Sequence, residues 1–264
     1  MLASVLGCLC TCLNAQTVRE KMFPNGEFFQ FDGHAAFILR PDDQPTSPVA
    51  QPWVFYAPAL AEYPDAHEEW MHRQFLAAGV AVAGIDVGEA YGSPESRKVF
   101  DRFFDELTER RGFGLRPCLL GRSRGGLWVS NWACDHPERF SGLAGIYPVF
   151  DLRTYPGLEK AAAAYDLTPS AFSQNLNQLN PIARVDVLAS AKLPIYIIHG
   201  DEDTVVPLNA NSAALAARYA AAGARGAIEL NVAKGQGHNF WQGFFRCQAL
   251  IDFVIDRAKN VSPR

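Results

Sequence analysis

A serine stands among small residues in the segment Gly121-Arg122-Ser123-Arg124-Gly125, which fits the pattern G-x-S-x-G. An apolar run precedes this segment, and a helical pattern follows it. A serine on such a sharp strand-to-helix turn exposes its hydroxyl, and flanking glycines let strand and helix pack closely. The helix N-terminus behind it favours a developing negative charge. The motif predicts that Ser123 is a nucleophile; the alternative is a glycine-rich turn that only joins a strand to a helix.

A serine hydroxyl is a weak nucleophile, so it needs a base within hydrogen-bond reach and an acid that orients the base. His238 lies in the loop between the last expected strand and the last expected helix, and we expect it to be the base. His199 ends a strand and is expected to support the turn that follows. The remaining histidines lie in a hairpin turn or in or next to expected helices: His34, His67, His72 and His136.

The acid is expected in the loop after the strand at 194–199, where Asp201, Glu202 and Asp203 lie close together. We favour Asp203 as the residue that orients His238. Asp201 and Glu202 are interpreted as solvated loop or turn residues.

Apolar strands alternate with helices along most of the chain. Such alternation predicts the α/β class, with a mostly parallel sheet covered by helices on both faces. The first two strands are expected to form a hairpin, at 26–31 and 35–40. The later strands are expected at 53–56, 80–86, 117–120, 143–147, 194–199 and 227–232, and the helices at 66–78, 95–111, 125–135, 208–222 and 240–258.

The alternation breaks at residues 150–193, which contain an alanine-rich piece and a polar helical piece. This segment is expected to be a small helical cap insertion that shapes specificity and limits access of water. The remainder predicts a single domain over residues 17–264.

The chain order Ser123, Asp203, His238 resembles that of the α/β-hydrolase superfamily, in its serine esterase and prolyl-oligopeptidase-like branch. HGDEDTVVP, at 199–207, is similar to the acid loop of those enzymes, and GQGH, at 235–238, to their histidine loop. DVGEAYGSP, at 86–94, is similar to their D-x-R-G-x-G-x-S turn, although the arginine is missing and Glu89 has no assigned role. The resemblance spans roughly residues 26–259 and implies the α/β-hydrolase fold.

Hydrogen-bond donors must face the oxyanion that forms during acyl transfer. The backbone N–H of Arg124 is expected to be one donor, since it follows the nucleophile. The second is expected from Ala59 or Leu60, in the loop after the strand at 53–56, because Pro58 has no N–H.

The two arginines beside the serine allow two interpretations. They can pair with nearby carboxylates such as Glu89, or Arg124 can point into the site. GRSRGG partly resembles the G-C-S-R-x-G motif of glucuronoyl esterases, in which that arginine helps to hold the oxyanion; an arginine can also bind a substrate carboxylate. Tyr91 and Trp241 are candidate surfaces on which a sugar or phenolic ring could stack.

The net charge is −4, without a basic run, so nucleic acid is not an expected partner. Beyond residue 16 no apolar run is long enough to span a membrane. Residues 1–16 are uncharged and mostly apolar, which is typical of an export signal; a loose apolar terminus or a misassigned start are the alternatives. We expect an exported protein, with a cytoplasmic one as the alternative. No metal or cofactor is implied.

These features predict a serine esterase that forms an acyl-enzyme, with small-molecule or carbohydrate esters as substrates. Acetyl, feruloyl and uronate esters of polysaccharides are the expected classes. The alternatives are a peptidase of the prolyl-oligopeptidase type and a non-enzymatic binding protein with the same fold. The sequence does not indicate an oligomeric state.

Overall fold

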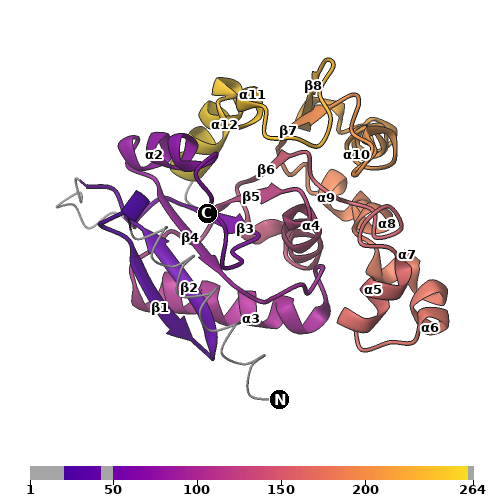
Figure 1. Ribbon diagram of the computed structural model, residues 1–264, viewed down its shortest axis with the longest axis horizontal. Coiled ribbons are helices and arrows are strands. Elements are labelled where there is room, and N and C mark those ends of the chain that lie inside the picture. Colours follow the sequence, from indigo (N-terminus) through magenta and orange to yellow (C-terminus); the bar gives the residue numbers. More distant parts are fainter. Residues whose placement is uncertain (1–20, 43–49, 261–264) are drawn as a thin grey trace, which may run out of the picture.

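A computed structural model describes residues 21–42 and 50–260 of the chain. Its strands are β1 (Glu27–Phe31), β2 (His34–Leu39), β3 (Trp53–Ala57), β4 (Ala81–Ile85), β5 (Cys118–Arg122), β6 (Gly142–Ile146), β7 (Ile195–Gly200) and β8 (Ile228–Ala233). They form one eight-stranded sheet in the order β1-β2-β4-β3-β5-β6-β7-β8 (Figure 1). Strands β3 to β8 pair in parallel, and the sheet is mostly parallel, as predicted.

The first two strands form the predicted antiparallel hairpin, and β2 also pairs antiparallel with β4. The hairpin turns at Asp32 and Gly33, whose φ angles are 50° and 80°. Asp-Gly is typical of two-residue turns with positive φ at both positions, because these turns match the twist of the flanking strands.

Side chains of the parallel strands alternate between two apolar layers. On β3, Trp53 and Phe55 face one layer, while Val54 and Tyr56 face the other. Since both faces are covered, β3 is apolar throughout instead of alternating with polar residues. The sheet therefore lies in the middle of the core.

Helices cover both faces, which confirms the predicted α/β-hydrolase architecture (Figure 1). The face that carries Trp53 packs against α3 (Pro94–Asp105), α4 (Gly125–Asp135), α9 (Asp186–Ser190) and α10 (Ser212–Ala221). The other face packs against α2 (Glu69–Ala77) and α12 (Gln248–Lys259).

Two expected helices end differently from the prediction. The helix expected at 95–111 is α-helical only to Asp105 and continues as a π-helical turn, Glu106–Arg110. The helix expected at 240–258 is divided into α11 (Gln242–Phe245) and α12. Phe244 and Phe245 both pack on the ring of Tyr147, and a separate turn allows two consecutive side chains to reach it.

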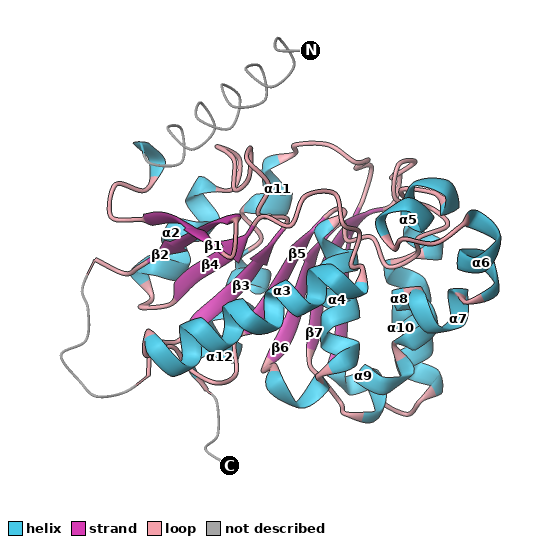
Figure 2. Cartoon of the chain, turned by 90° about the horizontal axis from the view of Figure 1, so that it is seen from below, coloured by secondary structure: helices cyan, strands magenta, loops and turns pink. Residues whose placement is uncertain are grey.

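The segment between β6 and β7 folds into short helices at one end of the molecule (Figure 2). α5 (Leu158–Ala164), α6 (Pro169–Gln174) and α7 (Leu176–Leu179) pack on a small apolar cluster that Phe172 of α6 shares with Leu127 of α4. By contrast, α8 (Pro181–Arg184) and α9 bury Ile182 and Leu188 in the main core beside the sheet.

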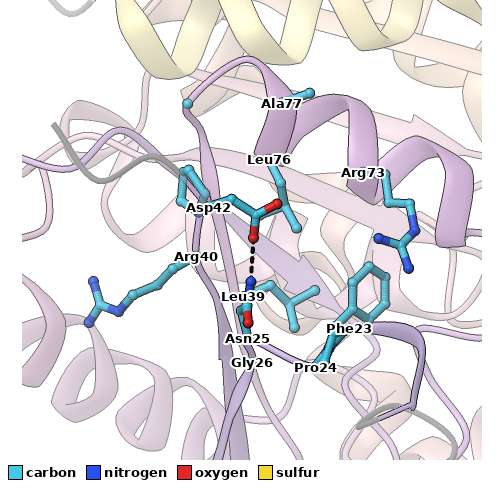
Figure 3. A pocket seen from close by; sticks show the side chains of 12 residues that line it. Phe23, Pro24, Asn25, Gly26, Leu39, Arg40, Asp42, Arg73, Leu76 and Ala77 are labelled. Atoms are coloured by element: carbon cyan, nitrogen blue, oxygen red, sulfur yellow. Dashed lines mark hydrogen bonds between the residues drawn. The ribbon is translucent and has the colours of Figure 1, made fainter.

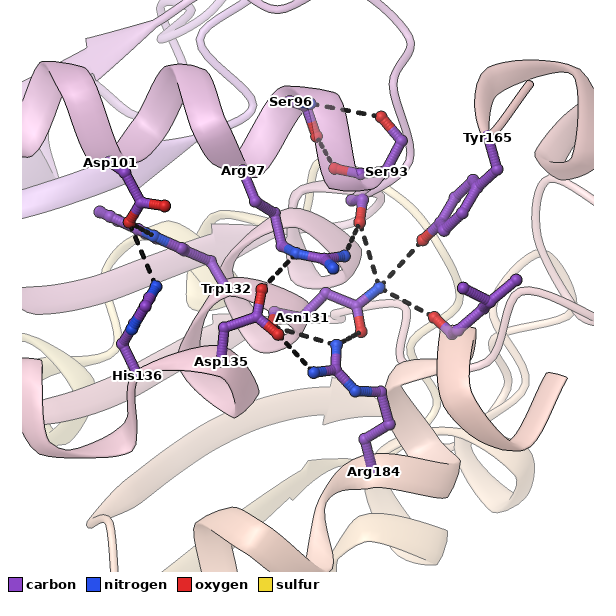
Figure 4. A network of polar contacts seen from close by, with 12 residues as sticks. Ser93, Ser96, Arg97, Asp101, Asn131, Trp132, Asp135, His136, Tyr165 and Arg184 are labelled. Atoms are coloured by element: carbon purple, nitrogen blue, oxygen red, sulfur yellow. Dashed lines mark hydrogen bonds and ion pairs between the residues drawn. The ribbon is translucent and has the colours of Figure 1, made fainter. Parts of the chain in front are cut away.

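A polar network attaches this helical segment to α4 (Figure 4). Asn131 on α4 donates from Nδ2 to the Tyr165 hydroxyl at 2.9 Å and to the Leu179 carbonyl at 3.0 Å. Its Oδ1 accepts a hydrogen bond of 2.9 Å from Arg184, which also pairs with Asp135. Because Asn131 is fully buried, these bonds replace the water that its amide would otherwise bind.

Within residues 21–42 and 50–260, no helix is both long and apolar enough to cross a membrane. Cys118, Cys134 and Cys247 are free thiols. The predicted export signal at 1–16 lies outside the described residues.

Candidate active site

Ser123 lies on the sharp turn between β5 and α4. Its φ of 50° is in the left-handed region that residues other than glycine rarely adopt. Its N–H donates to the Ile146 carbonyl at 2.9 Å, and its carbonyl accepts from Gly126 N at 3.0 Å and Val149 N at 2.8 Å. These backbone bonds hold the strained conformation and leave the hydroxyl free for chemistry.

The glycines of the motif are required by close packing around this turn. A Cβ on Gly121 would lie 2.8 Å from a Val129 methyl carbon, and a Cβ on Gly125 would lie 2.1 Å from the Ala57 carbonyl oxygen. The second distance shows that the start of α4 already lies directly against the end of β3. Strand and helix approach as closely as the sequence pattern predicts.

His238 reaches Ser123 from the loop after β8. Its Nε2 lies 2.9 Å from Ser123 Oγ, and its side chain is 18% exposed. The ring of Tyr147 packs against the imidazole, with ring centroids 4.3 Å apart. One edge of the imidazole therefore faces the serine, while a tyrosine supports its face.

Asp203 contacts the other nitrogen of His238. Its Oδ2 lies 2.7 Å from His238 Nδ1, and its Oδ1 accepts hydrogen bonds from the N–H groups of Val205 and Val206 at 3.0 and 2.7 Å. Burial acts to raise the pKa of Asp203, but hydrogen bonds from His199, His238 and Val206 outweigh it and hold this pKa well below its usual range. Asp203 is therefore a carboxylate at neutral pH.

His199, predicted to support the turn after β7, is fully buried beside Asp203. Its Nε2 lies 2.9 Å from the Val206 carbonyl and 3.3 Å from Asp203 Oδ2, while its Nδ1 lies 2.7 Å from Ser212 Oγ. A carbonyl only accepts, so Nε2 carries the proton and Nδ1 accepts from the serine hydroxyl. His199 thus donates to the groups that shape the acid loop.

The same reasoning assigns the proton on His238. A carboxylate only accepts, so Nδ1 donates to Asp203 and Nε2 is left to accept the Ser123 proton. The structure therefore brings the predicted nucleophile, base and acid together in one hydrogen-bonded chain. This arrangement can deprotonate a serine hydroxyl as it attacks a carbonyl carbon.

The residues expected to bind the oxyanion lie on both sides of the β3–α4 contact. Arg124 precedes the first residue of α4, where backbone N–H groups have no partner within the helix. Ala59 and Leu60 are buried just after β3, and the preceding Pro58 lies on the pocket wall. A Cβ on Gly125 would lie 2.1 Å from the Ala57 carbonyl oxygen, so the start of α4 is closely packed against the end of β3, and Pro58 lines the same pocket as Ser123 and Arg124.

The two flanking arginines both form ion pairs. Arg122 is buried, and its Nη1 lies 2.6 Å from Glu68 Oε2. Arg124 Nε lies 3.1 Å from Glu89 Oε1, and its Nη2 lies 3.5 Å from Glu62 Oε1. The structure thus contains the pairing of an arginine with Glu89 that the sequence analysis gave as one of its two interpretations.

Ser123 opens into a pocket of about 220 Å³. Aromatic side chains and both arginines line it: Pro58, Tyr63, Arg122, Ser123, Arg124, Tyr147, Tyr155, Val205, His238, Asn239 and Phe240. A larger hollow of about 510 Å³ lies between the end of β2 and α2, and it shares no lining residue with this pocket (Figure 3). The smaller pocket is the one that holds the Ser123 hydroxyl and His238.

Tyr91 and Trp241, the predicted ring-stacking residues, do not line this pocket. Tyr91 is buried and hydrogen-bonds Glu89, and burial raises the pKa of Tyr91 to about 12. Trp241 is 45% exposed and packs on Phe244. The sequence analysis missed Tyr63 and Tyr155, which come from loops without a motif.

A family model supplies the decisive comparison. The model of the prolyl oligopeptidase family matches residues 112–255, which is more than half of the chain and includes Ser123, Asp203 and His238. The chain belongs to the prolyl oligopeptidase family. It has the α/β-hydrolase fold, which the aligned structures share. No curated protein sequence matches it.

Solved structures of esterases and peptidases share the fold. Est1E from Butyrivibrio proteoclasticus aligns with a TM-score of 0.63 and 16% identity, over 88% of this chain and 98% of its own. Porphyromonas gingivalis dipeptidyl peptidase 4 aligns with a TM-score of 0.66 and 16% identity, over 88% of this chain and 35% of its own. The acylaminoacyl peptidase of Pyrococcus horikoshii aligns with a TM-score of 0.65 and 14% identity, over 90% of this chain and 42% of its own. The chain thus spans 35% and 42% of the length of these two peptidases.

Proposed function

We propose that the protein is a serine hydrolase that cleaves carboxylic esters, with Ser123 as nucleophile, His238 as general base and acid, and Asp203 as the group that orients His238. The observation that carries the proposal is the hydrogen-bonded chain of 2.9 Å and 2.7 Å that ends in the small pocket. It has the residue types, the order and the distances that nucleophilic acyl transfer requires.

In the proposed acylation step, Ser123 Oγ bonds to the ester carbonyl carbon while its proton passes to His238 Nε2. The carbonyl oxygen becomes an oxyanion, which the Arg124 N–H and an N–H of Ala59 or Leu60 stabilise. His238 then returns the proton to the departing alkoxide, and the alcohol leaves. The positive charge that His238 carries meanwhile faces the Asp203 carboxylate at 2.7 Å.

In deacylation, water takes the place of the alcohol. His238 removes a proton from the water molecule while the water oxygen bonds to the acyl carbon. The proton then goes to Ser123 Oγ as the acyl–serine bond breaks. The carboxylic acid leaves, and the enzyme returns to its starting state.

The size and lining of the pocket favour a small acyl group. A volume of about 220 Å³ lies below the roughly 300–1,000 Å³ typical of sites for larger ligands. Tyr63, Tyr155 and Phe240 offer ring surfaces for an aromatic acid or a sugar. We therefore propose acetyl or feruloyl esters, carried by a small molecule or a carbohydrate, as the substrate class.

Charges around the pocket favour an uncharged acyl group. The arginines beside Ser123 are paired with more carboxylates than they can neutralise: Glu62, Asp65, Glu68 and Glu89. An anionic acyl group would have to compete with Glu62 and Glu89 for Arg124. We expect Arg124→Ala to change hydrolysis of neutral esters and of esters bearing a free carboxylate to a similar extent.

The test is hydrolysis of a substrate panel by the wild type and by Ser123→Ala. The panel contains p-nitrophenyl acetate, p-nitrophenyl butyrate, methyl ferulate, an acetylated sugar, a benzyl glucuronate ester and Ala-Pro-p-nitroanilide. We expect cleavage of the small neutral esters, and a loss of about 10⁵- to 10⁶-fold in kcat in Ser123→Ala. Cleavage of the anilide alone would replace the proposal with a peptidase, and equal ester hydrolysis by both proteins would refute it.

A further inference from the structure

A buried charge cluster borders the pocket but takes no part in the proposed proton transfers. Its centre is Arg122, the residue before Ser123, which is 4% exposed. Arg122 Nη1 lies 2.6 Å from Glu68 Oε2 and 2.9 Å from Asp65 Oδ2. Glu68 is fully buried and accepts hydrogen bonds from the Tyr56 hydroxyl at 2.7 and 2.8 Å. Buried charges are costly unless they are paired, and these pairs satisfy that condition.

The first group of contacts anchors the segment 58–68 after β3. This segment carries both candidate residues for the second oxyanion donor, and Asp65 and Glu68 lie near its end. Tyr63 in the same segment places its ring centroid 4.9 Å from Arg122 Cζ. Arg122 therefore holds the segment against the strand that leads into Ser123.

The second group of contacts reaches the His238 side of the pocket. Arg122 Nε donates to the Tyr147 hydroxyl at 3.3 Å, and the Tyr147 ring supports the His238 imidazole. Arg122 Cζ also lies 4.9 Å from the ring centroid of Phe245 and 5.5 Å from that of Phe240. Both phenylalanines follow His238 closely in the chain.

One guanidinium thus joins three segments, each of which carries a different part of the proposed machinery. We propose that Arg122 is a positioning residue, which holds the 58–68 segment and the His238 loop in register with Ser123. The inference rests on the proposed function, since register matters only if Ser123 reacts. Arginine suits this task because its planar group donates in several directions and stacks on rings, whereas a lysine ammonium is a compact point charge.

The rate of reaction with a fluorophosphonate reports how well these segments are positioned around Ser123, and it needs no natural substrate. Ser123 Oγ bonds to phosphorus, the P–F bond breaks, fluoride leaves, and the hydroxyl proton passes to His238 Nε2. The phosphonyl oxygen gains negative charge where an ester oxyanion would form. The limiting rate constant, kinact, therefore reports the alignment of these groups, whereas KI reports binding before reaction.

Arg122→Lys is the main variant, because it retains the positive charge beside Glu68 and loses the planar group. Arg97→Lys is the matched control: Arg97 is 13% exposed in its side chain and pairs with Asp135 at 2.5 Å, away from the pocket lining. Thermal unfolding is recorded for both. We expect similar melting temperatures, a fall in kinact of about 10- to 100-fold for Arg122→Lys alone, and an unchanged KI.

Tyr147→Phe provides a second readout in case Arg122→Lys does not fold. It removes only the hydroxyl that accepts from Arg122 and keeps the ring against His238. We expect its kinact to fall with KI unchanged. The positioning role would be overturned if Arg122→Lys folds and keeps the wild-type kinact. If Arg122→Lys does not fold, a wild-type kinact in Tyr147→Phe would overturn it. Failure of the wild type to be labelled at Ser123 would instead overturn the proposed function and the inference with it.

Discussion

Replacing Gly125 by alanine is expected to push apart the two sides of the candidate oxyanion site. The new Cβ would lie 2.1 Å from the Ala57 carbonyl oxygen and 2.6 Å from Pro58 N. Ordinary contact begins at 3.4 Å, so the Ala57 oxygen or the start of α4 must retreat by about 1.3 Å, the difference between 3.4 and 2.1 Å. Both partners are backbone atoms, so no side-chain rotation can relieve the contact.

A displacement of about 1 Å in a catalytic arrangement can lower the rate about 100-fold. Overpacking of this kind also costs about 1–3 kcal/mol of stability, which leaves a domain of ordinary stability folded. We therefore expect kcat for p-nitrophenyl acetate to fall about 100-fold in a protein that still unfolds cooperatively.

Gly226→Ala is the matched control, because a Cβ on Gly226 would meet no atom within 4 Å. It is expected to keep the wild-type kcat and melting temperature. The assay is steady-state hydrolysis of p-nitrophenyl acetate beside thermal unfolding of each variant. A folded Gly125→Ala enzyme with wild-type kcat would refute the placement of the oxyanion site at the β3–α4 contact.

Three further predictions test other parts of the molecule. Asp203→Asn should lower kcat on the order of 10⁴-fold at pH 8 with little change in fold, because an amide allows the wrong tautomer of His238; steady-state kinetics measures this, and a kcat near wild type would contradict it. Burial, together with the Arg122 charge, lowers the pKa of His72 to about 3. The unfolded chain therefore binds a proton at His72 below about pH 6.5, while the folded chain does not. As the pH falls from 7.5 to 5, His72 alone should lower the free energy of unfolding by about 2 kcal/mol. His72→Phe should remove that part of the pH dependence in urea unfolding, and an unchanged dependence would show that His72 titrates normally. Asn131→Ala should cost about 1–3 kcal/mol and speed amide hydrogen exchange in α5–α7 before the rest of the chain, because it removes the bonds to Tyr165 and Leu179. Uniform exchange across the protein would argue against that local effect.

The parts of the site that could be predicted are those at strand ends. Ser123, Asp203 and His238 each follow a strand that is readable as a short apolar run, and the carboxyl ends of parallel strands meet at one edge of the sheet. Short motifs at these points are local, so one sequence is enough to find them. Hence the residues lie where the sequence analysis expected them.

The walls of the pocket could not be predicted in the same way. Tyr63 and Tyr155 stand in irregular loops, and no periodicity links them to Ser123. The partner of Arg122 was likewise hidden, because Glu68 is 54 positions away and the pair forms only when β3 and β5 lie side by side. Tyr91 shows the opposite case, since this aromatic residue in a suggestive motif is buried and does not line the pocket.

The predicted helix boundaries were wrong where tertiary packing overrides the local preference for a helix. The helical pattern over 240–258 continues through Arg246 and Cys247, yet the helix is interrupted at these two residues. Phe244 and Phe245 pack on Tyr147, and this contact depends on β6, about a hundred positions earlier in the chain. No local reading of the last helix contains that information.

The central claim is that Ser123 is the activated nucleophile of this serine hydrolase. Its most direct test is peptide mass spectrometry of the protein after reaction with a fluorophosphonate. We expect a phosphonyl adduct on the peptide that contains Ser123, loss of that adduct in Ser123→Ala, and much slower labelling in His238→Ala. An adduct on a different residue, or labelling of Ser123 at the wild-type rate without His238, would contradict the claim.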